Sequence, residues 1–264
     1  MTTVGTLRVP GKAAGEPVPP LVLAAAEVAV WTASLDLPRD RQARLATLLS
    51  DDECARAGRF RFERDRARYV AGRGTLRLLL SAYTGVAAAQ LRFRYGEFGK
   101  PALSDGGPSF NLSHSGGLAI YAFRREGEIG VDVELECADY ARERIPERFF
   151  SPREVADLRS LAPELQPRAF LNCWTRKEAF IKARGDGLSL ALDSFDVTLA
   201  PGQPAALLRT AWSAREPVRW QLHDLSDSTP SAVAALALRS ERPLAVTFHR
   251  LSNPDGTTWP LERR

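Results

Sequence analysis

The sequence predicts an α+β fold built from two similar halves, and three observations support this prediction. A Ser-x-x-Glu capping box, which opens a helix, occurs at Ser50 and again at Ser151. A longer helical segment that ends near glycine follows each box, at 64–84 and 167–183. Strand-like segments follow each long helix, so the chain repeats one α+β unit. The alternative is that this short motif occurs twice by chance.

Composition and pattern divide the chain into four parts. Residues 1–20 are rich in Gly, Pro and Ala and are expected to form a disordered leader. Residues 21–124 form the predicted first half, which starts with a strand at 21–31, and residues 125–239 form the second half. Residues 240–264 are expected to be a tail, to which we assign no function. Because ligand clefts commonly lie between domains, a duplicated unit predicts an active site between the halves.

Local signals predict the remaining elements of each half. A short helix follows the first capping box, and further strands are expected at 91–95 and 118–124. In the second half, Pro152 occupies the favoured first position of the helix that its capping box opens. After the second long helix, residues 188–199 predict a strand with turn residues inside it.

Composition excludes several classes of protein. The 264 residues can bury a sizeable core, and a charged fraction of 26% is ordinary for a globular protein. The chain has no apolar run of roughly 18 residues and no signal pattern at its start, so we expect a cytoplasmic protein. Its few cysteines and histidines are far apart, which argues against a disulfide framework, structural zinc or a histidine-based metal site. These residues are Cys54, Cys137, Cys173, His114, His223 and His249.

The segment Ile129–Leu135 alternates apolar and acidic residues after a glycine. Side chains alternate across a strand, so Asp132 and Glu134 lie on one face. The apolar neighbours on both sides favour a central strand, in which buried carboxylates need partners. The alternative is a solvated strand face.

Trp174, Glu178 and Lys182 are each four residues apart, so they lie along one face of a helix. Glu178 and Lys182 alone could form an ordinary surface salt bridge. If the helix packs across the acidic strand, three carboxylates and an ammonium group converge. Such a cluster favours a hard divalent cation, Mg²⁺ with a phosphate ligand being the usual one. The sequence thus predicts a metal-dependent enzyme that acts on phosphoryl groups.

Two glycine-containing segments are candidates for phosphate binding. Asn111–Gly116 places hydroxyls and His114 at a predicted turn, and Tyr95–Pro101 is a loop that carries Lys100. Turns of this kind expose backbone N–H groups that bind anions. An ordinary turn explains the glycines equally well, but it does not explain the histidine.

Eight arginines are concentrated between residues 56 and 77. In a chain with a net charge of +4, most of them should lie on solvated helix faces, and one or two should contact a phosphate. No aromatic interleaving or nucleic-acid motif accompanies them, so we expect no nucleic-acid partner. The arginines are Arg56, Arg59, Arg61, Arg64, Arg66, Arg68, Arg73 and Arg77.

Five segments, in this order, resemble the signature of the 4′-phosphopantetheinyl transferases, in the larger, monomeric type that activates surfactin synthetase and similar assembly lines. The resemblance covers roughly residues 50–197. It implies a pseudo-dimer of two α+β halves with the active site between them. The segments are Phe98–Pro101, Asn111–Gly116, Gly130–Glu134, Arg148–Glu154 and Trp174–Leu188.

The resemblance implies a transferase of secondary metabolism, in non-ribosomal peptide and polyketide synthesis. Coenzyme A would lie between the halves, and the serine hydroxyl of an apo acyl or peptidyl carrier protein would attack its β-phosphorus. The products would be the holo carrier protein and 3′,5′-ADP. Mg²⁺ is the implied cofactor, held by Asp132, Glu134 and Glu178. We expect a cytoplasmic monomer that binds no membrane.

The resemblance also implies roles for single residues. Glu178 would be the general base, directly or through water, and Lys182 would stabilise the phosphates; how they share proton transfer with a metal-bound water is open. Lys177 is a further implied phosphate contact. The implied coenzyme-binding residues surround the adenine nucleotide, the 3′-phosphate and the pyrophosphate. They are Arg56, Arg64, Gly99, Lys100, Pro101, Ser113, His114, Asp132, Glu178 and Lys182.

Two other classes of function remain open at this point. A metal-dependent hydrolase of coenzyme A or another nucleotide would share the carboxylate cluster, and it would release phosphopantetheine without a carrier protein. A nucleotide-sensing protein would bind coenzyme A without turnover.

Overall fold

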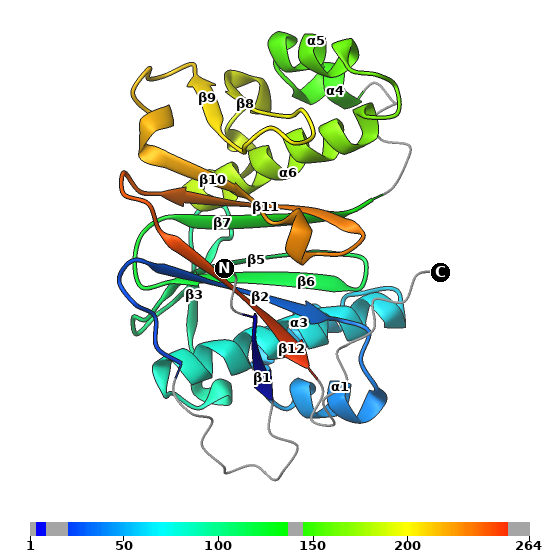
Figure 1. Ribbon diagram of the computed structural model, residues 1–264. Coiled ribbons are helices and arrows are strands. Elements are labelled where there is room, and N and C mark those ends of the chain that lie inside the picture. Colours follow the sequence, from blue (N-terminus) through cyan, green and yellow to red (C-terminus); the bar gives the residue numbers. More distant parts are fainter. Residues whose placement is uncertain (1–3, 9–20, 137–144, 253–264) are drawn as a thin grey trace.

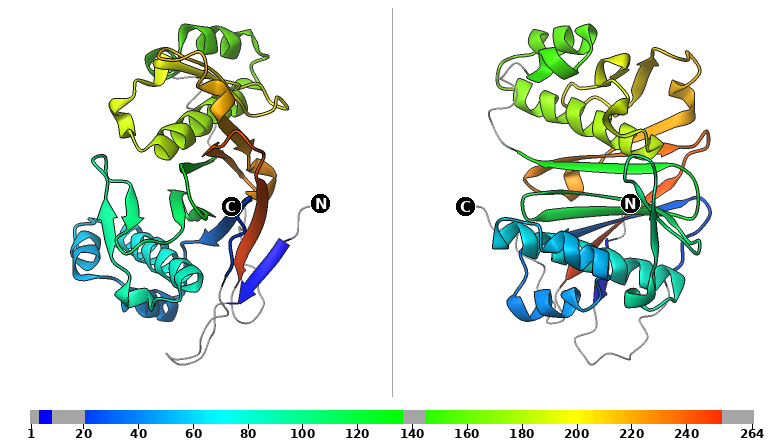
Figure 2. Two further views of the ribbon diagram at one scale, coloured as in Figure 1. Left: turned by 90° about the vertical axis from the view of Figure 1, so that its left-hand side faces the viewer. Right: turned by 180° about the vertical axis from the view of Figure 1, so that it is seen from behind.

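The computed structural model describes residues 4–8, 21–136 and 145–252. Figure 1 shows two halves, each with one long helix packed on antiparallel strands. Figure 2 shows that the two long helices, α3 (Glu63–Thr84) and α6 (Gln166–Arg184), lie on the same side of the strands, one in each half. This mixed architecture confirms the predicted α+β fold of two similar halves.

The first half contains three helices and five strands. The long helix α3 covers one face of its sheet. The elements are β2 (Glu27–Ser34), α1 (Arg39–Ala46), α2 (Asp51–Ala57), α3 (Glu63–Thr84), a 3₁₀ turn (Ala88–Gln90), β3 (Phe93–Tyr95), β4 (Pro101–Leu103), β5 (Ser109–Ser115) and β6 (Leu118–Arg124).

The second half repeats this plan with additional 3₁₀ turns. Its elements are β7 (Ile129–Leu135), α4 (Ile145–Phe149), α5 (Pro152–Ser160), α6 (Gln166–Arg184), 3₁₀ turns at Gly187–Ser189 and Leu192–Ser194, β8 (Phe195–Val197), β9 (Leu207–Thr210), a 3₁₀ turn (Pro217–Arg219), β10 (Trp220–Asp224), a 3₁₀ turn (Ser226–Ser228) and β11 (Ala232–Arg239).

Strand order establishes that the halves are equivalent. In the first half the order is β2-β6-β5, and in the second half it is β7-β11-β10, with every neighbouring pair antiparallel. The first strand of each half thus pairs with its last, and the second-to-last strand lies outside. Repetition of the capping box is therefore part of a repeated fold and not a chance recurrence.

Both capping boxes form, and both long helices end as predicted. The backbone N–H of Ser50 donates to Glu53 at 3.0 Å, and that of Ser151 donates to Glu154 at 2.9 Å. The helices α3 and α6 end at glycines with left-handed backbone, Gly85 at φ 72° and Gly185 at φ 82°. Glycine adopts this conformation without the steric cost that other residues incur.

The capping-box glutamates have a second role. Glu53 pairs with the buried Arg77 at 2.6 Å and also with Arg73, and Glu154 pairs with the buried Lys177 at 2.8 Å. Each glutamate therefore joins a short helix to the long helix of its own half. Arg73 and Arg77 are consequently not the solvated helix-face residues that the sequence suggested.

Two predicted strands have different boundaries. The first strand begins at residue 27 rather than 21, because Leu21 and Leu23 pack against the core beneath α3 and the Leu21 N–H donates to the Ala82 carbonyl. Residues 188–199 form mainly 3₁₀ turns, and only Phe195–Val197 is a strand.

The predictions of a disordered leader and a tail were wrong for two segments. Val4–Arg8 forms β1 and Ala245–Ser252 forms β12, and both extend the first sheet to the order β1-β12-β2-β6-β5. The strand β12 runs parallel to β2, and its apolar Val246 and Phe248 pack on the core between the halves. Residues 1–3, 9–20 and 253–264 lie outside the described residues.

Three clusters of buried side chains form the core. One lies under α6, one lies under α3, and the third combines strands of both halves, including Val30 and Ile120 from the first and Val131 and Leu236 from the second. The shared cluster fixes the halves against each other. Among the described residues, no helix is both long and apolar enough to cross a membrane.

Candidate functional site

The strands β5 and β7 meet where the two halves join, and side chains of β5 hold the backbone of β7. The Asn111 Oδ1 accepts from the N–H of Val131 at 2.9 Å, and the Ser115 Oγ accepts from the N–H of Leu135 at 3.2 Å. The Asn-x-Ser-x-Ser segment is therefore a strand that forms a seam between the halves. The turn begins only at Gly116, so the prediction of a turn at Asn111–Gly116 was wrong for most of this segment.

The helix α6 crosses β7 at close range because of Gly130. A Cβ atom at this position would collide with the backbone of Ala179 and Ala183 in α6. Glycine therefore permits the approach that brings Glu178 and Lys182 onto the acidic strand. The convergence expected from the sequence depends on this contact.

Asp132 lies at the centre of the cluster and is only 2% exposed. Its Oδ1 accepts from the Ser113 hydroxyl at 2.8 Å and from the Lys182 ammonium at 2.5 Å. Its Oδ2 is buried without a hydrogen-bond partner. A buried carboxylate oxygen that lacks a donor is costly, which favours a ligand at this position. The solvated-face interpretation does not hold for Asp132.

The pKa of all three carboxyl groups of this site is raised. Burial is the main cause for Asp132, Glu134 and Glu178, and in each case it lifts the pKa above the ordinary value. The negative charge of Asp132 adds to the increase for both glutamates, and Lys182 opposes it. The cluster thus places three carboxyl groups near the Lys182 ammonium.

The oxygen donors fit a hard divalent cation. Asp132 contributes the unpartnered Oδ2, and Glu134 and Glu178 supply further carboxylate oxygens near it. Oxygen-only donor sets suit Mg²⁺. Within the described ranges, no three acidic, histidine or cysteine side chains already form a metal-binding group. Lys182 takes one oxygen of Asp132, so cation binding requires some rearrangement of these side chains.

A pocket of about 460 Å³ lies beside this cluster, with walls from both halves. It contains five of the residues for which the sequence implied a site: Gly99, Lys100, Pro101, Glu178 and Lys182. Its other lining residues are Phe98, Asn111, Leu112, Ile181, Gly185 and Gly187.

Two lysines differ from their expected surroundings. The Lys100 ammonium donates to the carbonyls of Ile129 at 2.9 Å and Ala183 at 2.8 Å, and burial lowers its pKa to about 8. It therefore ties the first-half loop to the second half. Lys177 is completely buried against Glu154 and far from solvent, so its expected phosphate contact was wrong.

His114 follows Ser113 on β5 and therefore points to the opposite side of the strand. Partial desolvation and the nearby positive charge of Lys182 hold the pKa of His114 below its ordinary value. The charge of Asp132 raises this pKa, and that of Arg68, which pairs with Asp36 at 2.6 Å, lowers it further.

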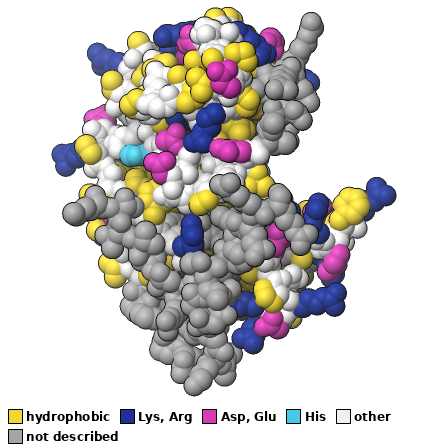
Figure 3. Space-filling view, turned by 45° about the vertical axis from the view of Figure 1, so that its right-hand side comes forward, with side chains coloured by type: hydrophobic (Ala, Val, Ile, Leu, Met, Phe, Trp, Pro, Cys, Tyr) yellow, Lys and Arg dark blue, Asp and Glu magenta, His cyan; other side chains and the backbone are white. Residues whose placement is uncertain are grey.

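The structure does not bring Arg56 and Arg64 into the pocket beside Lys182. Arg64 lines a separate groove of about 970 Å³ between α1, α2 and α3, and its guanidinium lies 3.4 Å from Asp65. The Arg56 guanidinium lies over the ring of Tyr69, 5.6 Å from its centre. On the face seen in Figure 3, basic side chains are mixed with acidic ones and form no continuous patch.

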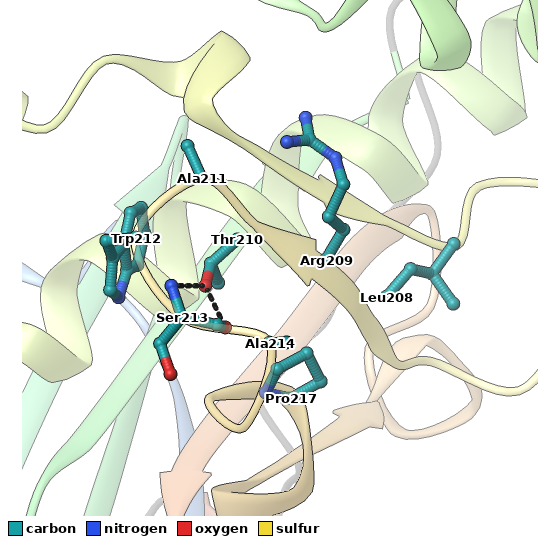
Figure 4. A pocket seen from close by; sticks show the side chains of 8 residues that line it. All are labelled: Leu208, Arg209, Thr210, Ala211, Trp212, Ser213, Ala214 and Pro217. Atoms are coloured by element: carbon teal, nitrogen blue, oxygen red, sulfur yellow. Dashed lines mark hydrogen bonds between the residues drawn. The ribbon is translucent and has the colours of Figure 1, made fainter.

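A third pocket, of about 350 Å³, lies in the second half around Trp212 (Figure 4). The Thr210 hydroxyl donates to the Ser213 carbonyl there and closes the loop that forms its wall. This pocket contains none of the residues implied by the sequence, so it does not extend the site.

The sequence analysis did not predict the roles of two polar residues in the seam. Asn111 and Ser115 hold the backbone of β7, and the Ser115 hydroxyl also donates to Glu134 at 2.8 Å. The signal was available, because residues at every second position of a strand share one face.

Comparison with known families covers most of the chain. Residues 128–238 match the family model described as "4'-phosphopantetheinyl transferase superfamily". Residues 37–125 match the model described as "4'-phosphopantetheinyl transferase, N-terminal". The two matches correspond closely to the two halves of the fold.

Curated relatives carry the same description. The 4'-phosphopantetheinyl transferase HetI of Nostoc sp. is 44% identical over 76% of this chain and 86% of its own length. The 4'-phosphopantetheinyl transferase Sfp of Bacillus subtilis is 35% identical over 62% of this chain and 72% of its own length. With the family matches on both halves, these similarities show that the chain belongs to the 4'-phosphopantetheinyl transferase superfamily and is an enzyme of that class.

Proposed function

We propose that the protein transfers 4′-phosphopantetheine from coenzyme A to a serine of apo acyl or peptidyl carrier proteins in a Mg²⁺-dependent reaction. The observation that supports this most strongly is the meeting of Asp132, Glu134, Glu178 and Lys182 beside a pocket with walls from both halves. Positive charge stabilises a reacting pyrophosphate. The three carboxylates would supply ligands for Mg²⁺, and Lys182 supplies an ammonium group.

Asp132, Glu134 and Glu178 would hold Mg²⁺. The bound ion would neutralise charge on the pyrophosphate of coenzyme A. Asp132 Oδ2 is available as a cation ligand, since it has no hydrogen-bond partner. Lys182 would move its hydrogen bond from Asp132 to a phosphate oxygen, since an ammonium binds phosphate as a compact charge.

Glu178 is our proposed general base. Its raised pKa makes it a better proton acceptor than an ordinary glutamate, although cation binding would offset part of this effect. The carrier serine would lose its proton to Glu178, directly or through water, as its oxygen bonds to the β-phosphorus. The bond from that phosphorus to the bridging oxygen would break, and Lys182 would stabilise the departing 3′,5′-ADP.

Coenzyme A would enter through the pocket that Gly99, Lys100 and Pro101 line, with its adenine nucleotide against this loop. Ser113, which already contacts Lys182 at 3.0 Å, would bind a phosphate oxygen, and His114, on the opposite side of β5, would bind an oxygen of a different phosphate. We keep Arg56 as a candidate contact of an outer phosphate. We set Arg64 aside because it lines the groove between α1, α2 and α3.

The proposed setting is a cytoplasmic monomer that serves non-ribosomal peptide or polyketide assembly, with no nucleic-acid or membrane partner. The seam supports a monomer, because one chain supplies both β5 and β7 of the proposed site. Carrier proteins and coenzyme A are the expected partners.

Intact-mass spectrometry of an apo peptidyl carrier domain tests this proposal. The domain is incubated with the protein, coenzyme A and Mg²⁺, with parallel reactions that contain EDTA or the Glu178→Gln variant. We expect a gain of one phosphopantetheine that both controls abolish. Release of 3′,5′-ADP without a carrier would favour a hydrolase instead, and binding of coenzyme A without turnover on acyl or peptidyl carriers would favour a sensor.

A further inference from the structure

Ser115 connects the two halves at the end of the acidic strand. It lies in β5 of the first half, yet both of its side-chain hydrogen bonds reach β7 of the second. The Ser115 Oγ accepts from the Leu135 N–H at 3.2 Å and donates to the Glu134 Oε2 at 2.8 Å.

These two bonds fix the direction of the hydroxyl proton. A serine hydroxyl has a single proton to donate, and the backbone N–H of Leu135 occupies one of its acceptor positions. The proton is therefore committed to the carboxylate of Glu134. This holds the Oε2 in place and leaves the other carboxylate oxygen for a different ligand.

The turn after Ser115 keeps this geometry rigid. Gly116 has a left-handed backbone at φ 54°, and a Cβ atom there would collide with the side chain of Leu135. A side chain at Gly117 would likewise collide with Asp36, which Arg68 holds through two hydrogen bonds. The hydroxyl thus lies at the end of β5, next to a closely packed turn.

The same relation occurs two residues earlier. The Ser113 hydroxyl donates to Asp132, as the Ser115 hydroxyl donates to Glu134. The two serines are two residues apart on β5, and the two acidic residues are two residues apart on β7. Two hydroxyls on one strand therefore face two carboxylates on the neighbouring strand. Ser113 also contacts Lys182, whereas Ser115 has no such contact in the described part of the chain, so Ser115 isolates the effect on a single carboxylate.

We propose that Ser115 is a positioning residue that orients Glu134 for divalent cation binding, so that the cation site forms only when the two halves are joined along the β5–β7 seam. This inference rests on the proposed function, because it assigns Glu134 to the cation. Groups that hydrogen-bond to metal ligands typically change metal affinity or activity by about 10-fold to 100-fold when they are removed.

The first test measures cation binding without any turnover. Free Mn²⁺ is followed by its paramagnetic resonance signal during titration of the protein with coenzyme A present and no carrier protein. We expect Ser115→Ala to weaken Mn²⁺ binding by about 10-fold or more. Ser115→Thr keeps a hydroxyl and should recover most of the loss. The control Ser109→Ala removes a hydroxyl from the start of the same strand and should match the wild type.

The second test separates positioning from simple destabilisation. Transfer to a carrier protein is measured against Mg²⁺ concentration, together with thermal unfolding of each variant. Positioning predicts that Ser115→Ala raises the Mg²⁺ concentration for half-maximal rate and leaves the KM for coenzyme A close to that of the wild type.

Unchanged Mn²⁺ affinity in a folded Ser115→Ala variant would overturn the inference, even with lowered thermal stability. In that case wild-type transfer would still stand, and only the role of Ser115 would be lost. A wild-type protein that binds Mn²⁺ but transfers nothing to carriers would instead defeat the proposed function and leave the positioning role supported.

Discussion

The two long helices α3 and α6 each contain a buried cation at an equivalent position, but they carry different residues at the positions around it. Arg77 and Lys177 lie at the same distance before the terminal glycine of each helix, and both are buried against a capping-box glutamate. The positions that correspond to Glu178 and Lys182 are held by Leu78 and Ala82 in the first half.

The difference lies in what covers this face of each helix. In the first half, Leu21 and Leu23 pack on the core beneath α3 and close it, and Leu21 bonds to the Ala82 carbonyl. In the second half the equivalent face borders the pocket and carries Glu178 and Lys182. The two halves therefore share one fold, but the candidate site lies in the half whose helix face borders a pocket and carries charged residues in place of apolar ones.

The largest effect is expected when the second half is given the residue of the first. Glu178→Leu should lower transfer to a carrier protein by about 1,000-fold or more, because the proposed base and cation ligand is lost. Rates measured by intact mass at saturating coenzyme A check this, with thermal unfolding to show that the variant is folded. A rate within 10-fold of the wild type, on the order of 1.4 kcal/mol in the barrier, would remove Glu178 from the chemistry.

Substitutions in the buried ion pairs test whether the pairs of the two halves contribute equally to the stability of the protein. Glu53→Gln and Glu154→Gln should each destabilise the protein by about 3–5 kcal/mol, since each leaves a buried cation without its carboxylate. Urea denaturation measures the free energy of unfolding. Glu53→Gln should be the more severe, because Glu53 pairs with two buried arginines, Arg73 and Arg77, whereas Glu154 pairs with Lys177. Equal or smaller loss for Glu53→Gln would contradict this ranking.

Removing one charge from the carboxylate cluster should stabilise the cation-free protein. The raised pKa of Glu178 means that the folded state holds its proton to higher pH than the unfolded state does, so wild-type stability falls as pH rises above 4.5. Glu178→Gln escapes this loss and should gain on the order of 1 kcal/mol at neutral pH, or about 2–4 °C in Tm. The gain should vanish below pH 4.5, and a gain that persists there would have another cause.

The smallest expected effect concerns Lys100, which joins the halves at the other end of the pocket. Lys100→Met should cost about 1 kcal/mol at pH 7, because the carbonyls of Ile129 and Ala183 lose their donor. With the pKa lowered to about 8, the unfolded state binds more protons between pH 8 and 10.5. Wild-type stability should therefore rise across this range relative to the variant, as measured by urea denaturation at each pH. Parallel profiles would show that Lys100 does not titrate there.

Local patterns allowed the repeated frame to be predicted from the sequence. Capping boxes, terminal glycines and the alternation of the acidic strand depend on neighbours in sequence, so Ser50, Gly185 and Asp132 were placed correctly. The convergence of Glu178 with Asp132 also followed, once helix and strand were assumed to cross.

Features that depend on distant partners were not predicted. The burial of Lys177 depends on the carbonyls of Leu192 and Phe195, which no local pattern indicates. The seam function of Asn111 and Ser115 depends on β7 lying beside β5. The strand β12 was missed because its partner β2 is more than two hundred residues away in sequence.

The position of β12 also determines when the first sheet can be completed during synthesis. Since β12 lies between β1 and β2 in the first sheet, this edge of β2 stays unpaired until residues 245–252 have emerged from the ribosome. The half that is made first is therefore completed last. A chain that stops after residue 239 would expose that strand edge, which is the kind of surface that promotes aggregation. Completion of the first sheet thus requires synthesis through β12.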